Sequence, residues 1–106
     1  MRSDWLASGL LAILAGVAMA DAARAADAYN GGQIGRRWCE PCHVVAGDQR
    51  GTTGEAPPFA SIATRPGFDA GQLAVFLLDP HPKMPNFFLT RTEATDVAAY
   101  IGSLRK

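Results

Sequence analysis

The two cysteines of this chain, Cys39 and Cys42, are only three positions apart. A disulfide between them would close a very small loop and would remove little entropy from the unfolded chain. Once the N-terminal segment described next is removed, about 80 residues remain, a size at which a hydrophobic core alone is marginal. We therefore expect the fold to depend on a large apolar cofactor, which adds buried surface that the polypeptide cannot supply by itself.

The first 25 residues have the order of a secretory signal peptide: a short charged start, an uninterrupted weakly polar stretch over residues 6–20, and then small residues. The apolar stretch falls short of the roughly 20 residues that a membrane-spanning helix needs, which argues against an uncleaved anchor. We expect cleavage after Ala25, although cuts after Ala20 and Ala22 also fit the small-x-small rule. The sequence thus divides into a signal peptide, residues 1–25, and one exported domain, residues 26–106.

Apolar spacing and capping signals predict an all-α domain of about four short helices. The clearest is the last, where Thr90 and Glu93 form a capping box and apolar residues follow at i, i+3, i+4 and i+7. Three further helices are expected over residues 27–38, 59–64 and 69–78, with an irregular loop over residues 46–58. We find no alternating strand pattern in the exported part of the sequence.

Cys39, Cys42 and His43 form a C-x-x-C-H motif. On a helical turn, positions i, i+3 and i+4 share one face. Two thiols can then add to the two vinyl groups along one edge of a haem, while the adjacent imidazole reaches the iron. In an exported protein this spacing predicts one covalently attached c-type haem, bound through both cysteines, with His43 as an axial iron ligand.

Two other uses of these cysteines fit less well. Trp38 and Pro41 complete a W-C-x-P-C pattern like that of thioredoxin-like thiol oxidoreductases, but such a dithiol follows a buried strand in a βαβ framework, and the sequence has no Val/Ile-rich strand. A zinc site made of both cysteines, His43 and His81 is also disfavoured. Its adjacent ligands Cys42 and His43 would have to point at one metal with no turn between them.

Met84 is the predicted second axial ligand, because it is the only methionine outside the signal peptide. Prolines at positions 82 and 85 bracket it, so the loop would hold a thioether against iron with little backbone freedom. A lone methionine often fills a core, but no apolar period surrounds this one. His81 is the competing ligand and would give a bis-imidazole haem.

With these residues, the chain resembles the class I c-type cytochromes of bacteria over nearly all of residues 26–106. In that family an N-terminal helix with small residues crosses a C-terminal helix that bears an aromatic side chain. Gly31 or Gly35 and Tyr100 match those places. The resemblance implies a cytochrome c-like fold around one haem. The chain is shorter than mitochondrial-type members and lacks their lysine excess.

The resemblance also implies a role for Pro57, whose carbonyl would accept the Nδ1 hydrogen of His43 and so fix the orientation of the ring. The doubled proline leaves Pro58 as an alternative. Such second partners of a ligand are part of the site, because they set the tautomer and basicity of the imidazole.

We expect a periplasmic electron carrier that exchanges single electrons with soluble or membrane-bound redox partner proteins. It would not be an enzyme, because two filled axial positions leave no site for substrate or oxygen. The alternative is a catalytic or gas-binding haem protein with an open axial position. Ten basic and ten acidic side chains balance in the whole sequence, which disfavours nucleic acid as a partner. Contact with a membrane is expected only through the signal peptide or membrane-bound partners.

If haem consumes both thiols, the purified exported protein will contain no free thiol, and its haem will resist extraction with acidic acetone. Replacing Cys39 or Cys42 by Ala leaves one attachment point and should lower the yield of haem-containing protein, because the chain loses a constraint on its main stabilising ligand. Recovery of a colourless protein after extraction would contradict the covalent assignment.

Overall fold

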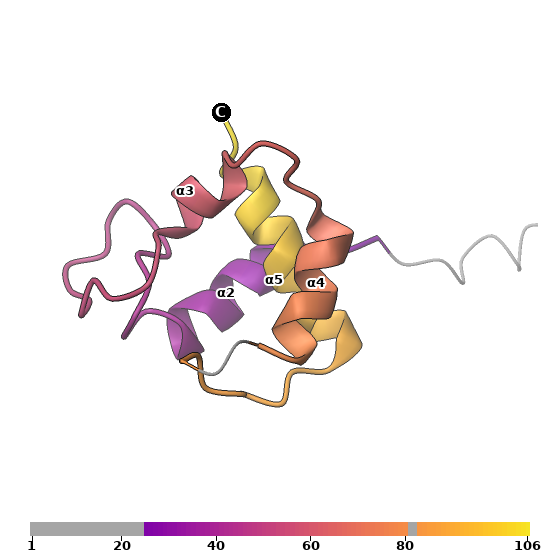
Figure 1. Ribbon diagram of the computed structural model, residues 1–106, viewed down its shortest axis with the longest axis horizontal. Coiled ribbons are helices and arrows are strands. Elements are labelled where there is room, and N and C mark those ends of the chain that lie inside the picture. The colour runs from indigo at the N-terminus through magenta and orange to yellow at the C-terminus, as the bar shows by residue number, and fades with distance from the viewer. Residues whose placement is uncertain (1–24, 81–82) are drawn as a thin grey trace, which may run out of the picture.

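The computed structural model describes residues 25–80 and 83–106, and Figure 1 shows their arrangement. They form four α-helices and contain no strand, which confirms the predicted all-α class. None of these helices is both long enough and apolar enough to cross a membrane. The helices are α2 (Ala28–Trp38), α3 (Phe59–Ala63), α4 (Ala70–Leu78) and α5 (Arg91–Ser103).

Three of the helices begin where the local sequence predicts. The side chains of Asp27 and Asp69 each accept a hydrogen bond at 2.9 Å from the backbone amide three residues further on, and so cap α2 and α4. At α5, Thr90 and Glu93 form the reciprocal capping box, with distances of 3.1 and 3.0 Å. These side chains satisfy amides that have no partner within the first helical turn.

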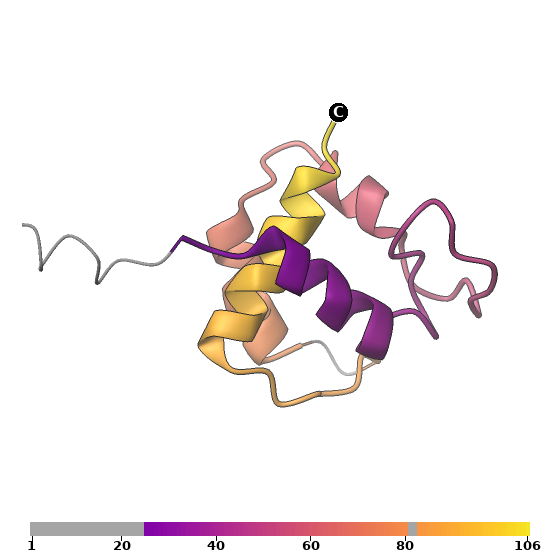
Figure 2. The same ribbon diagram turned by 180° about the vertical axis from the view of Figure 1, so that it is seen from behind.

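Helix α5 is the centre of the fold and contacts each of the other three helices. In Figure 1 and, from behind, in Figure 2, α2 crosses α5, and α4 lies alongside α5. The buried apolar side chains come from α3, α4, α5 and the turn and loop after α2: Cys39, Val45, Phe59, Ala63, Ala74, Leu77, Ala94, Val97, Ala98 and Ile101.

The helices α2 and α5 approach most closely at Gly31. A Cβ atom added there would overlap the backbone carbonyl of Asp96, so only glycine permits this crossing. One residue further on, Gly32 faces the ring of Tyr100, which a Cβ would approach to 3.0 Å. The structure therefore identifies Gly31, of the two glycines that the family resemblance offers, as the crossing point.

Gly35 makes room for a different part of the chain. A Cβ at this position would lie 3.1 Å from Val45 and 3.2 Å from the ring of Phe59, both outside α5. The glycine face of α2 thus accommodates two neighbours: α5 near its start, and the loop and α3 near its end.

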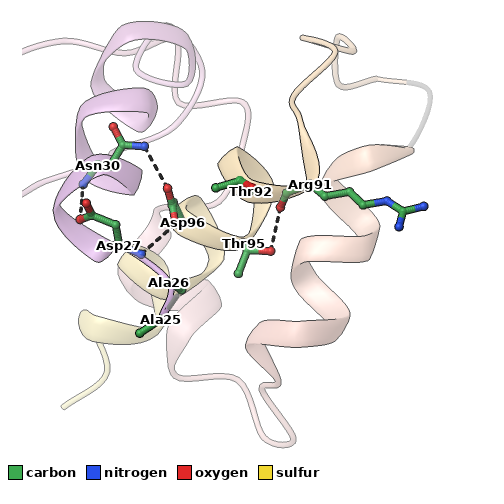
Figure 3. Close-up of a pocket in the computed structure, with 8 residues that line it drawn as sticks. All are labelled: Ala25, Ala26, Asp27, Asn30, Arg91, Thr92, Thr95 and Asp96. Carbon is green, nitrogen blue, oxygen red and sulfur yellow. Dashed lines mark hydrogen bonds between the residues drawn. The ribbon is translucent and has the colours of Figure 1, made fainter. Parts of the chain in front are cut away.

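A buried carboxylate fastens the beginning of α2 to α5, as Figure 3 shows. Asp96 is 4% exposed and accepts hydrogen bonds from the backbone amide of Asp27 at 2.8 Å and from the side-chain amide of Asn30 at 2.9 Å. Both carboxylate oxygens therefore have a partner, which offsets the cost of burying them. Asp96 carries no recognisable motif, and sequence reasoning did not identify it.

We predict that Gly31→Ala destabilises the haem-containing protein by about 3 kcal/mol, because the added methyl group meets backbone that cannot rotate away. The measurement is guanidinium unfolding followed by haem absorbance. Gly47→Ala is the matched control, since no heavy atom lies within 4 Å of a Cβ at that position. Equal stability of the two variants would mean that α2 and α5 do not approach as closely as described.

Candidate functional site

One cavity of about 670 Å³ contains all five residues that the sequence predicts for the cofactor site. This volume is within the range of cofactor and ligand pockets in proteins. Cys39, Cys42, His43, Pro57 and Met84 all line it. Most of the remaining wall is apolar, as an inserted macrocycle requires: Trp38, Phe59, Ile62, Leu73, Phe76, Leu77, Phe87 and Ile101.

The C-x-x-C-H motif forms a tight turn that continues α2. The amide of Cys39 donates to the carbonyl of Gly35 at 2.8 Å, and the carbonyl of Cys39 accepts from the amides of Cys42 at 3.2 Å and His43 at 2.9 Å. The two sulfurs are not joined by a disulfide. This turn brings both thiols and the imidazole to the same cavity, as the helical spacing predicts.

Burial raises the pKa of the Cys39 thiol to about 11, with a smaller contribution from Cys42. This thiol is therefore protonated near neutral pH. The reactive cysteine of a thioredoxin-like oxidoreductase has a lowered pKa instead, and its fold contains strands. The described residues contain no cluster of three His, Cys, Asp or Glu side chains that could hold a metal ion. His81 lies outside the described residues.

The backbone that carries His43 is held by four separate parts of the chain. Each carbonyl from residue 42 to residue 45 accepts a hydrogen bond, and the four donors come from different positions. The bonds are Ala56 N–H to Cys42 at 3.3 Å, Gln49 Nε2 to His43 at 2.8 Å, Phe59 N–H to Val44 at 2.9 Å, and Tyr100 Oη to Val45 at 2.8 Å. These four hydrogen bonds hold residues 42–45 in place, although the segment has no regular structure.

The His43 ring has a defined partner on one side. Its Nδ1 lies 2.6 Å from the carbonyl oxygen of Pro57, so Nδ1–H is the donor and Nε2 is the nitrogen left with a lone pair. Phe59 packs against the ring, with centroids 5.1 Å apart. Pro58 does not take the place of Pro57, because its carbonyl accepts hydrogen bonds from the first turn of α3.

Met84 is half-buried and packs against the edge of the core. It lines the same cavity as His43, together with Pro85. The structure thus brings together two side chains that are distant in the sequence and that have the donor atoms, nitrogen and sulfur, preferred by haem iron.

Basic and aromatic side chains form part of the cavity rim. The guanidinium of Arg37 lies 5.1 Å from the ring centroid of Trp38, and Trp38 lies 5.8 Å from Phe87. Lys83 is exposed at the same rim. The neighbouring Arg36 pairs instead with Asp48 at 3.4 Å, at the surface.

Helices around an apolar cavity, with two cysteines and a histidine on one turn, define the class of c-type haem proteins. The chain belongs to the small monohaem c-type cytochromes. It is 55% identical over 97 residues to cytochrome c-552 of Bradyrhizobium diazoefficiens, and the aligned residues cover 92% of this chain and 93% of that protein. No family model and no solved structure matches. The protein is accordingly a haem c electron carrier, with covalently bound haem and iron, that serves redox partner proteins.

Tyr100→Phe should destabilise the haem-containing protein by about 1 kcal/mol, because the Val45 carbonyl loses the hydroxyl that it accepts from. Tyr29→Phe is the matched control, since Tyr29 is 78% exposed and the same hydroxyl removal there should cost almost nothing. Guanidinium unfolding of both variants provides the test. Equal midpoints would contradict a stabilising role for this hydrogen bond.

Proposed function

We propose that this protein is a periplasmic electron carrier whose haem is attached at Cys39 and Cys42 and whose iron is bound by His43 and Met84. The observation that carries the proposal is the convergence of these four side chains on one apolar cavity. When bound, haem c supplies a single-electron couple between ferrous and ferric iron. The chain has to orient the ligands, exclude water and leave no open coordination position.

His43 is suited to be the ligand on one side of the haem plane. The carbonyl oxygen of Pro57 lies 2.6 Å from Nδ1 and accepts its hydrogen, which fixes the tautomer and leaves Nε2 to bind the iron. Phe59 restricts rotation of the ring by packing against it.

Met84 is suited to be the ligand on the other side. A thioether is a soft donor that favours ferrous iron, so it raises the reduction potential above that of a bis-histidine haem. With both axial positions filled, neither substrate nor oxygen can bind the iron. With this ligand pair, the protein would carry electrons and would not act as an enzyme. An open position would instead favour a catalytic or gas-binding haem protein.

Export is supported by where the domain begins. Cleavage after Ala25 leaves intact both Asp27, which caps α2, and the whole of α2, which starts at Ala28. Ala25 and Ala26 are exposed and precede the first described helix. Residues 1–25 would then be the signal peptide and residues 26–106 the periplasmic domain. Residues 1–24 lie outside the described part of the chain.

Exogenous ligands distinguish a closed haem site from an open one. The unaltered reduced protein should not bind carbon monoxide, whereas Met84→Ala should bind it readily. Met84→His should keep both positions filled and lower the reduction potential, because imidazole is the harder donor. Absorbance titration and potentiometry are the measurements.

His81→Ala is the control for ligand identity, and it should leave both the carbon monoxide response and the potential unchanged. If His81→Ala opened the iron while Met84→Ala kept the unaltered spectrum, His81 would replace Met84 as the ligand. Binding of carbon monoxide by the unaltered reduced protein would favour the open-site alternative.

A further inference from the structure

One side chain, Gln49, makes four hydrogen bonds within the loop that follows the C-x-x-C-H turn. Its Oε1 accepts from the amide of Val45 at 2.8 Å. Its Nε2 donates to the carbonyls of His43 at 2.8 Å, Gly51 at 2.9 Å and Glu40 at 3.1 Å. All four partners lie between residues 40 and 51, so Gln49 closes this loop from the inside.

The loop needs such a residue because it has no helix or strand to satisfy its backbone. A polar backbone group that is removed from water requires a partner. This loop has both a donor and acceptors to satisfy: the amide of Val45, and the carbonyls of Glu40, His43 and Gly51. A carboxamide has an acceptor oxygen and a donor nitrogen on one short plane. Glutamate in this place would turn an oxygen toward three carbonyl oxygens.

Gln49 acts directly on the backbone of His43. The amide of His43 is fixed by the carbonyl of Cys39 at 2.9 Å, and its carbonyl by Gln49 at 2.8 Å. With both backbone groups held, the ring can reach Pro57 at 2.6 Å in one orientation. We propose that Gln49 is a positioning residue for the axial imidazole, and that it sets the strength of the bond between His43 and Pro57. This inference rests on the proposed role of His43 as an iron ligand.

Two variants separate positioning from space filling. Gln49→Met keeps the approximate shape and the charge but removes every hydrogen bond of the side chain. Gln49→Glu keeps an oxygen for Val45 and removes the donor to His43. Thr52→Ala is the matched control, because Thr52 is an exposed residue of the same loop whose hydroxyl donates to Pro41 at 3.3 Å and not to residues 43–45.

The readouts are the reduction potential and the nuclear magnetic resonance signals of the His43 ring in the ferric protein. Gln49→Met should raise the potential, because a weaker bond to Pro57 makes the imidazole a poorer donor to ferric iron. The His43 ring signals should move in both Gln49→Met and Gln49→Glu. In Gln49→Met, exchange of the Val45 amide should be roughly tenfold faster, equivalent to the loss of about one hydrogen bond. Thr52→Ala should match the unaltered protein in all three measurements.

If Gln49→Met only lowers stability, with the potential and the His43 ring signals unchanged, Gln49 is a structural residue and the inference is wrong. If Gln49→Met yields no haem-containing protein, Gln49→Glu decides through its ring signals. In the unaltered ferric protein, the His43 ring signals should show the large shifts that bound ferric iron causes. Their absence would overturn the ligand assignment itself. That result is distinguishable from a failure of the inference about Gln49 alone.

Discussion

The close crossing of α2 over α5 is the constraint on which the rest of the structure depends. Two backbones can approach this far only because Gly31 has no side chain to meet the carbonyl of Asp96. The crossing places the Asp96 carboxylate next to the first residues of α2, where it accepts two hydrogen bonds. It also places Tyr100 one turn along α5 against Gly32. The helix pair is thus held by close packing at Gly31 and Gly32 and by the two hydrogen bonds of Asp96.

From this helix pair, the position of the site follows in steps. The ring of Tyr100, on α5, packs against Gly32 of α2, and its hydroxyl donates to Val45, two residues after His43. Phe59 lies between these parts, with ring centroids 5.1 Å from His43 and 6.4 Å from Tyr100. The loop that carries His43 is therefore positioned by the helices through side chains, although it contains no regular structure of its own.

The cavity rim combines aromatic and basic side chains. The two aromatic rings of Trp38 and Phe87 lie together beside Arg37 and Lys83, and Phe87 is followed by Phe88, which is 85% exposed. Opposite charges balance over the whole sequence, so long-range steering by net charge is modest.

Much of this architecture follows from local sequence signals. Asp27, Asp69 and Thr90 predict where three helices begin, because capping involves residues only three apart. The C-x-x-C-H spacing likewise predicts a turn that brings two thiols and an imidazole together, because these residues are also only a few positions apart. Elimination selects Met84, since residues 26–106 contain no other methionine. Its ligation of iron remains a prediction, whereas its position in the cavity with His43 is a property of the fold.

Some choices that are equivalent in the local sequence are settled by packing. Pro57 and Pro58 are adjacent and chemically identical, but the start of α3 occupies the carbonyl of Pro58 and leaves that of Pro57 for His43. Among the glycines, Gly31 marks the crossing because α5 passes there. Asp96 and Gln49 have no local signal, since their importance comes from groups that folding brings to them. Local sequence signals predict the helix starts, the motif and the cofactor class, because these depend on neighbours a few residues apart. The hydrogen-bond partners of His43 and Asp96 depend on which distant segments meet, and those contacts form only when the chain packs.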